Sequence, residues 1–252
     1  MAERSWQSRL WYESLRRVVQ LTAVAGYSLR VWGRENIPPT GGVLVVSNHQ
    51  SHFDPPLIGM GCPRRMNYLA RSTLFGFAPF RWLIHSLDAI PIEREGIGLG
   101  GIKESLKRLK RGEMVLIFPE GTRTRDGQVA PFLPGFTTLA TRSRSAILPV
   151  AIEGAFQAWP RWRKVPGLGT IHVRFGKPIL PEQVAGCDER EIVAEVEARV
   201  RVCHAQLLRH PAFSRTKRLE GPMSRDRCDQ AADESSGKIA SPAAWRTLQP
   251  LG

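Results

Sequence analysis

The sequence predicts an α/β fold, with one domain built on a mixed or mostly parallel central sheet that helices cover. Short, fully apolar runs alternate with amphipathic segments of helical period, as expected for strands and helices that follow one another along the chain. A chain of 252 residues with 42% hydrophobic content can bury a sizeable core, and this length suits one domain better than two. We therefore expect a single folded domain.

Five short apolar runs predict its strands. They are Val43 to Val46, Met66 to Ala70, Ala89 to Ile92, Met114 to Phe118 and Ile147 to Ile152. Runs of this length without a polar face are typical of strands buried on both sides. A sixth strand is predicted at residues 171–175, where apolar residues alternate with His172 and Arg174, so that one face should be wet.

Two amphipathic helices are predicted within the domain. Leu99, Ile102, Leu106 and Leu109 are spaced three or four apart, which indicates a helix between the third and fourth strands. Ile192, Val196, Val200, Cys203 and Leu207 form the apolar stripe of a second helix within the charged segment 188–209.

The two ends of the chain differ from the predicted domain, residues 30–212. Residues 1–29 have Trp6, Leu10 and Trp11 at near-helical spacing among basic residues, which predicts an amphipathic helix. Its apolar stripe is compatible with a membrane interface and with packing on the core. No apolar run approaches the roughly 20 residues of a membrane-spanning helix. Residues 213–252 are rich in Ser, Arg, Asp, Gly and Pro, so we expect a disordered tail.

The net charge indicates which kinds of partner to expect, and the cysteine spacing indicates which kinds of site are absent. A formal net charge of +13 favours an anionic partner, namely nucleic acid, a phospholipid surface or a phosphorylated substrate. The four cysteines show no C-x-x-C pairing, so neither a disulfide framework nor a zinc site is expected. The charged N-terminal segment has no signal-peptide pattern, and we expect the protein to remain inside the cell.

Two polar loops follow predicted strands directly. Residues 47–55, Ser-Asn-His-Gln-Ser-His-Phe-Asp-Pro, place His49 and Asp54 where a turn could bring them together. A histidine can accept a proton near neutral pH, and a carboxylate on its other ring nitrogen fixes the tautomer. Asp54 could equally cap a helix that starts at Asp-Pro-Pro.

The second loop, residues 118–123, reads Phe-Pro-Glu-Gly-Thr-Arg and supplies a glycine, a hydroxyl and a guanidinium suited to a phosphate. A further arginine, Arg94, ends the segment Ile-Pro-Ile-Glu-Arg at residues 90–94. Arg94 and Arg123 are therefore candidates for clamping one phosphate, although a single arginine is more commonly a solvated surface charge.

Together with Ile-Leu-Pro-Val-Ala-Ile at residues 147–152, these segments resemble in order the four motifs of the glycerophospholipid acyltransferases related to bacterial PlsC. The family patterns are Asn-His-x-x-x-x-Asp, Ile-Pro-Ile-x-Arg, Phe-Pro-Glu-Gly-Thr-Arg and apolar-Pro-Val-Ala-Ile, and the resemblance spans about residues 30 to 180. Chance agreement of all four in order is implausible.

The resemblance implies a glycerolipid acyltransferase-like fold and a role for each matching residue. His49 would be the general base that deprotonates the acceptor hydroxyl, and Asp54 would orient it. The residues that would hold the glycerol phosphate are Arg94, Glu120, Gly121, Thr122 and Arg123. No cofactor or metal is implied, because a thioester is already activated.

The implied reaction moves a fatty acyl group from acyl-CoA or acyl-ACP to the sn-2 hydroxyl of 1-acylglycerol-3-phosphate (lysophosphatidic acid), giving phosphatidic acid in phospholipid biosynthesis. We expect a peripheral protein on the cytoplasmic side of an anionic membrane surface. Another lysophospholipid or a lyso-ornithine lipid remains possible as acceptor. Many relatives have a lysine-rich Phe-Lys-x-Gly segment where this chain has Phe132-Leu133-Pro134-Gly135, and Arg125, Arg142 or Arg144 could compensate.

Two rival classes explain less of the sequence. A basic nucleic-acid-binding module would account for the charge and the seven tryptophans, but no nucleic-acid-binding motif is recognisable, so no nucleic acid is expected as a partner. A lipid esterase would need a nucleophile elbow, and the sequence lacks Gly-x-Ser-x-Gly.

Overall fold

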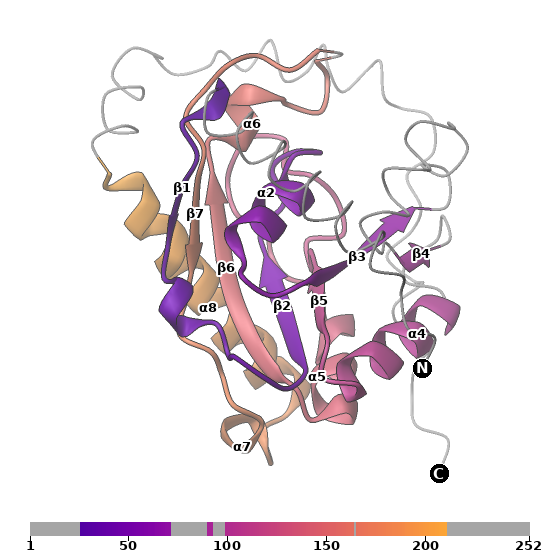
Figure 1. Ribbon diagram of the computed structural model, residues 1–252. Helices are drawn as coiled ribbons and strands as arrows, with labels where there is room; N and C mark the ends of the chain where they lie inside the picture. Colours follow the sequence, from indigo (N-terminus) through magenta and orange to yellow (C-terminus); the bar gives the residue numbers. More distant parts are fainter. Residues whose placement is uncertain (1–25, 72–89, 93–98, 164, 211–252) are drawn as a thin grey trace.

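The computed structural model describes residues 26–71, 90–92, 99–163 and 165–210, which contain a seven-stranded sheet with helices on both faces (Figure 1). The strands are β1 (Arg30–Trp32), β2 (Val43–Ser47), β3 (Met66–Arg71), β4 (Ile90–Ile92), β5 (Met114–Ile117), β6 (Ala146–Glu153) and β7 (His172–Phe175). The α-helices are α2 (Asp54–Gly61), α4 (Leu99–Lys110), α5 (Thr137–Ser143), α6 (Ala155–Ala158), α7 (Pro181–Val184) and α8 (Glu189–Leu208), and two 3-10 turns are η1 (Arg34–Asn36) and η3 (Pro134–Phe136).

The strand order is β1-β7-β6-β2-β5-β3-β4. All neighbouring strands are parallel except β6 and β7, which pair antiparallel. The predicted mixed, mostly parallel sheet is therefore confirmed. Each of the five apolar runs forms a strand within one or two residues of its predicted bounds.

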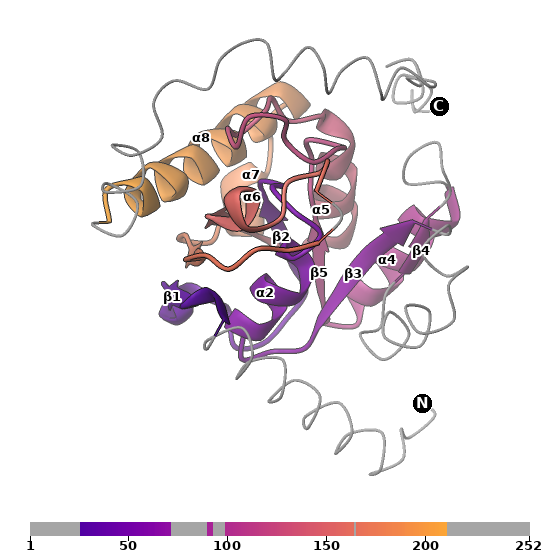
Figure 2. The ribbon, with the colours of Figure 1, turned by 90° about the horizontal axis from the view of Figure 1, so that it is seen from above.

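The central strands are buried on both faces because their alternate side chains enter two separate cores. Val43 and Val45 of β2 join a cluster that includes residues of α2. Leu44 and Val46 point the other way, into a cluster with residues of α4, α5 and α8. Figure 2 shows α2 and the pair α5 and α8 on opposite sides of the sheet. Such two-sided burial is what a continuous apolar run requires.

Helix α8 confirms the predicted stripe, since all five of its apolar positions are buried. Its start is fixed by a capping box: the Asp188 carboxylate accepts from the backbone N–H of Glu191, and the Glu191 carboxylate accepts from that of Asp188. The helix then runs across the sheet with its stripe against the core.

The prediction of a wet face on β7 is wrong. His172 is fully buried, and Arg174 is half-buried. The indole of Trp32, on the unpredicted edge strand β1, lies edge-on to His172 with ring centroids 4.7 Å apart, and His210 lies at the same centroid distance. Burial lowers the pKa of His172 to about 4, with the charges of His210 and Arg30 adding to the effect and Glu153 opposing it.

Two predictions lie outside the described residues: nearly all of the N-terminal amphipathic helix at 1–29, and the tail at 213–252. Within the described part of the chain, no helix combines the length and apolarity that crossing a membrane requires.

Candidate functional site

The polar loops meet at one edge of the sheet, the edge formed by the carboxyl ends of β2, β5 and β6 (Figure 1). Because these three strands are parallel neighbours, the segments that leave them emerge side by side. Ligand sites of open α/β sheets commonly occupy this edge. The loop 48–53 leaves β2, the loop beginning at Phe118 leaves β5, and α6 follows β6.

The structure brings His49 and Asp54 together. Nδ1 of His49 lies 2.7 Å from Oδ2 of Asp54, while the His49 side chain keeps 19% of its surface exposed and that of Asp54 is fully buried. A buried carboxylate on Nδ1 holds the imidazole in the tautomer whose Nε2 can accept a proton. The pair therefore has the geometry of an oriented general base.

Asp54 does not cap the helix that it begins. The N-cap position of α2 is Phe53, and no side chain makes a capping bond there. The carboxylate turns back instead, and its Oδ2 accepts from the backbone N–H of Gln50 at 2.5 Å and of Ser51 at 2.7 Å. Asp54 thus shapes the loop and orients His49 through one oxygen.

The loop after β5 is bonded to His49 itself. The Glu120 carboxyl oxygen Oε1 accepts from the backbone N–H of His49 at 3.0 Å, and the N–H of Thr124 donates to the His49 carbonyl at 2.8 Å. The ring of Phe118 stacks on the imidazole, with centroids 4.0 Å apart and planes inclined by 17°. The first and third predicted motifs therefore form one unit.

Glu120, which joins these two motifs through the His49 backbone, is only 7% exposed. Burial raises the pKa of Glu120 to about 8, against the opposing effect of hydrogen bonds from the backbone of His49 and Ala130. The negative charge of nearby Asp54 raises the pKa further. In this structure the carboxyl of Glu120 accepts from the His49 backbone, and the role in holding the glycerol phosphate that the resemblance implied stays a prediction.

The rest of the predicted phosphate site is more open. Gly121 and Thr122 are exposed, and Arg123 is half-buried. Gly121 has φ +70°, in the left-handed region that favours glycine, and a Cβ added there would lie 3.1 Å from the Leu133 side chain. Arg94 lies outside the described residues, so the expected clamp of two arginines is represented here by Arg123 alone.

Asn48 is a functional neighbour that the sequence analysis did not single out. Its amide pairs with the backbone of β6, donating to the Ile152 carbonyl at 3.0 Å and accepting from the Ile152 N–H at 2.9 Å. The side chain thus continues the pairing between β2 and β6 after β2 has ended at Ser47. It fixes where the loop that carries His49 begins.

Gln50 belongs to a buried polar network that was also missed. Its amide nitrogen donates to the Gly127 carbonyl at 3.1 Å and to Glu153 Oε2 at 2.8 Å, and its amide oxygen accepts from the Phe156 N–H at 3.2 Å. Glu153 Oε2 also lies 2.6 Å from Nε2 of His204 on α8. The network joins the His49 loop to the other core layer, and no local sequence pattern signals it.

Two of the arginines proposed to replace the absent lysine lie at the wrong end of the sheet. Arg142 and Arg144 are exposed just before β6 begins at Ala146, whereas the site borders the other end of this eight-residue strand. At about 3.3 Å per residue these ends are about 25 Å apart. Arg125, which is exposed on the loop after β5, remains as a candidate.

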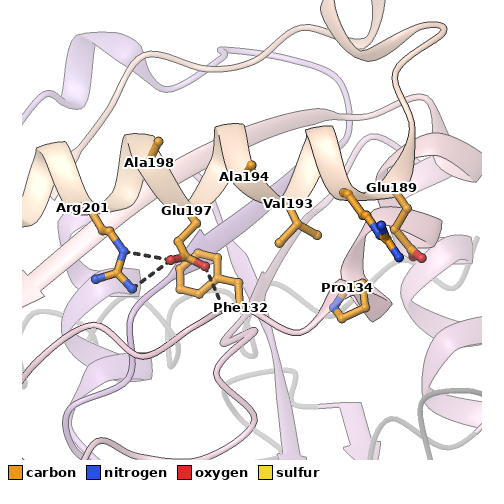
Figure 3. A pocket seen from close by; sticks show the side chains of 9 residues that line it. Phe132, Pro134, Glu189, Val193, Ala194, Glu197, Ala198 and Arg201 are labelled. Atoms are coloured by element: carbon orange, nitrogen blue, oxygen red, sulfur yellow. Dashed lines mark hydrogen bonds and ion pairs between the residues drawn. The ribbon is translucent and has the colours of Figure 1, made fainter.

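The segment without lysine lies beside a hollow of about 580 Å³ along α8 (Figure 3). Phe132 and Pro134 line it from one side and Val193, Glu197 and Arg201 from the other. Figure 3 shows Glu197 bonded both to Arg201 and to the Phe132 backbone, whose N–H donates at 2.9 Å. None of the predicted site residues that the structure describes lines this hollow.

Comparison with known proteins agrees with this geometry. The family model "Acyltransferase" matches residues 28–153, which include His49, Asp54 and the loop after β5. A 1-acyl-sn-glycerol-3-phosphate acyltransferase of Pseudomonas aeruginosa is 35% identical over 182 residues, covering 70% of this chain and 67% of that protein. The Bacillus subtilis protein of the same name is 29% identical over 167 residues, covering 66% of this chain and 81% of that protein.

The fold has a solved relative as well. The crystal structure of the 1-acyl-sn-glycerophosphate (LPA) acyltransferase PlsC from Thermotoga maritima matches with a TM-score of 0.70 and 26% identity, covering 83% of this chain and 85% of that one. The chain spans 44% and 51% of the length of two chloroplast relatives. The family model, the relatives and the shared fold lead to one conclusion: this chain belongs to the acyltransferase family of enzymes.

Proposed function

We propose that the protein transfers a fatty acyl group from a thioester, acyl-CoA or acyl-ACP, to the sn-2 hydroxyl of 1-acylglycerol-3-phosphate, giving phosphatidic acid. The observation that carries the proposal is the His49–Asp54 pair, 2.7 Å apart, beside the exposed Gly121-Thr122 turn and Arg123. The names of the relatives in Pseudomonas, Bacillus and Thermotoga support the same acceptor.

In the proposed mechanism Nε2 of His49 takes the proton of the acceptor hydroxyl while Asp54 stabilises the imidazolium that forms. The hydroxyl oxygen attacks the thioester carbonyl, and the tetrahedral intermediate collapses to the ester as the carbon–sulfur bond breaks. The proton on His49 then passes to the departing thiolate, which leaves as a thiol. The enzyme returns to its starting state without a covalent intermediate.

Arg123 and the Gly121-Thr122 turn are proposed to hold the acceptor phosphate, together with Arg94. A guanidinium can bind two phosphate oxygens at once, and the hydroxyl of exposed Thr122 can donate to a third. Glu120 takes part through the His49 backbone, which it accepts from at 3.0 Å. These contacts would fix the phosphate relative to the base and so align the sn-2 hydroxyl.

The test is transfer of labelled acyl groups from acyl-CoA and acyl-ACP to lysophosphatidic acid, comparing the intact protein with His49→Ala. We expect a fall in product formation of about 100-fold or more, the usual contribution of a positioned general base. His210→Ala is the matched control, because His210 packs against Trp32 at the β1 edge. Equal activity of the parent and His49→Ala would overturn the role of His49.

The head group is tested in the same assay with other acceptors. The Phe132-Leu133-Pro134-Gly135 segment lacks the lysine of many relatives, so lysophosphatidylethanolamine, lysophosphatidylglycerol and a lyso-ornithine lipid are included. Preference for lysophosphatidic acid is expected. A faster reaction with another lyso-lipid would change the acceptor but keep the acyl transfer.

We further infer that the protein works peripherally at the cytoplasmic face of the membrane. The inference is supported by the lipid acceptor, the net charge of +13 and the amphipathic pattern of residues 1–29. Membranes washed at high salt should release a large share of the protein, because screening weakens attraction to anionic lipid. Retention after alkaline extraction would contradict peripheral attachment.

A further inference from the structure

An exposed apolar segment lies at the same edge of the sheet as His49. Residues 161–163 and 165–168 come after α6, and three of their side chains project into solvent, with Trp162 50%, Val165 69% and Leu168 84% exposed. Among the described residues only Leu180 and Val202 are other large hydrophobic side chains of comparable exposure. The N–H of Phe156 in α6 donates to Gln50 of the loop that carries His49 at 3.2 Å, and Figure 2 looks down on this edge.

The same segment is basic. Arg161 and Arg163 are exposed, and the sequence contains no Asp or Glu between Glu153 and Glu182. Tryptophan and aliphatic side chains surrounded by arginine suit the interface of an anionic bilayer, where the rings enter the head-group region and the cations meet lipid phosphates.

The segment is held in shape by bonds at its base. The indole N–H of Trp159 donates to the Arg163 carbonyl at 2.8 Å, and the N–H of Gly167 donates to the Ala158 carbonyl at 2.8 Å. Trp162 lies edge-on to Phe156, with ring centroids 5.3 Å apart. The exposed side chains are therefore presented between residues that these bonds hold together.

This loop is also attached to the loop that carries His49. The Ser51 hydroxyl donates to the Trp159 carbonyl at 2.9 Å, and the indole of Trp159 packs on Phe53 with ring centroids 4.8 Å apart. Ser51 and Phe53 lie between His49 and Asp54 in the sequence. A surface that binds Trp162, Val165 and Leu168 would therefore lie close to His49.

We propose that residues 161–163 and 165–168 form a membrane-docking loop that inserts Trp162, Val165 and Leu168 into an anionic phospholipid surface and sets the His49 site against it. The proposal rests on the proposed function in that the acceptor is a lipid. It adds a contact separate from the amphipathic segment predicted at residues 1–29. Just after the loop, the N–H of Ile171 donates to the carbonyl of Tyr27 at 2.9 Å.

The test is vesicle co-sedimentation of the full chain, with vesicles of phosphatidylcholine containing phosphatidylglycerol and vesicles of phosphatidylcholine alone. The double variant Trp162→Ser/Leu168→Ser should bind the anionic vesicles about tenfold more weakly. The matched control is Leu180→Ser/Val202→Ser, which removes two exposed apolar side chains elsewhere and should bind like the parent. Arg161→Gln/Arg163→Gln should weaken binding to the anionic vesicles only.

Activity separates this proposal from the proposed function. With a short-chain lysophosphatidic acid dispersed as monomers, the Trp162→Ser/Leu168→Ser variant should match the parent, whereas with acceptor in vesicles its rate should fall about tenfold. A parent that is inactive with every lyso-lipid would refute the function while leaving the binding result in place. Equal vesicle binding by parent and variant would overturn the docking loop, as would a change confined to self-association in sedimentation velocity.

Discussion

At the scale of single residues, a small number of contacts fix the position of the His49 imidazole. Oδ2 of Asp54 accepts from two backbone N–H groups and contacts the imidazole, so one oxygen shapes the loop and orients the base. The other contacts of His49 come from the loop after β5, through Glu120, Thr124 and the ring of Phe118. The position of the imidazole is therefore set from two strands.

Asp54→Asn tests the electrostatic part of this arrangement. The amide oxygen can still accept from the loop, but it cannot stabilise an imidazolium as a carboxylate does, so we expect kcat to fall about 100-fold or more. The measurement is kcat at saturating acceptor, with circular dichroism to confirm the fold. A kcat within a few-fold of the parent would show that Asp54 only shapes the loop.

Sequence reasoning paired His49 with Asp54, which the structure brings together, and missed the residues that hold their loop in place. His49 and Asp54 could be paired from their spacing and from the preceding strand. Asn48 and Gln50 could not be placed, because their partners lie about a hundred positions away on β6 and beyond it. A polar residue bonded over such a distance has the same local sequence as one that faces water.

At the scale of elements, α8 is bound to the site through the Glu153–His204 contact at 2.6 Å. Both side chains are nearly fully buried, and Glu153 also accepts from Gln50. Replacing His204 leaves a buried carboxylate with one partner fewer. The helix thus contributes to the His49 loop although none of its residues lies in the predicted motifs.

His204→Ala should lower the free energy of unfolding by about 1–3 kcal/mol, the usual cost of leaving a buried polar group unsatisfied, and cavity formation adds to it. Urea unfolding measures this change. Arg199→Ala is the control on the same helix, because it removes an exposed ion pair with Glu195 and should cost less than about 1 kcal/mol. Equal losses would mean that the buried contact adds nothing beyond an exposed one.

The elements themselves were predictable where one short pattern decides them. Apolar runs gave β2, β5 and β6, and the stripe at every third or fourth position gave α8. The edge strand β1 is three residues long, and it is defined by pairing with β7, about 140 positions later, which no local pattern signals. The burial of His172 was missed for the same reason, since Trp32 and His210 cover it from distant segments.

At the scale of the whole molecule, two buried groups should make stability depend on pH in opposite directions. Glu120 has its pKa raised from 4.5 to about 8, so between these values the unfolded chain loses a proton that the folded chain keeps. The free energy of unfolding therefore falls as pH rises through this window and levels off above it.

Glu120→Gln should abolish that fall while retaining an acceptor for the His49 N–H. Urea unfolding across the window measures the slope, and we expect the variant to gain stability relative to the parent as pH approaches 8. A parallel pH dependence of parent and variant would show that Glu120 titrates near its ordinary value in the folded protein.

His172 acts on the acid side. Its pKa is lowered from 6.5 to about 4, so between pH 4 and pH 6.5 the histidine is protonated in the unfolded chain and neutral in the folded chain. The free energy of unfolding should fall as pH decreases from 6.5 to 4. His172→Phe keeps a ring against Trp32, and we expect its unfolding to be less sensitive to acid in this range. If acid destabilised this variant as strongly as the parent, other groups would be responsible.

The hydrogen bonds of Gln50 have a consequence for which substitutions the chain can accept. The amide nitrogen of Gln50 donates to two acceptors and the amide oxygen accepts from one N–H, so the orientation of the amide is fixed. Glutamate has the same shape but would place a second carboxylate against Glu153. Leucine would leave the Phe156 N–H without its hydrogen-bond acceptor. In a saturation library selected for growth, position 50 should therefore retain glutamine almost exclusively, while exposed His52 two positions later varies.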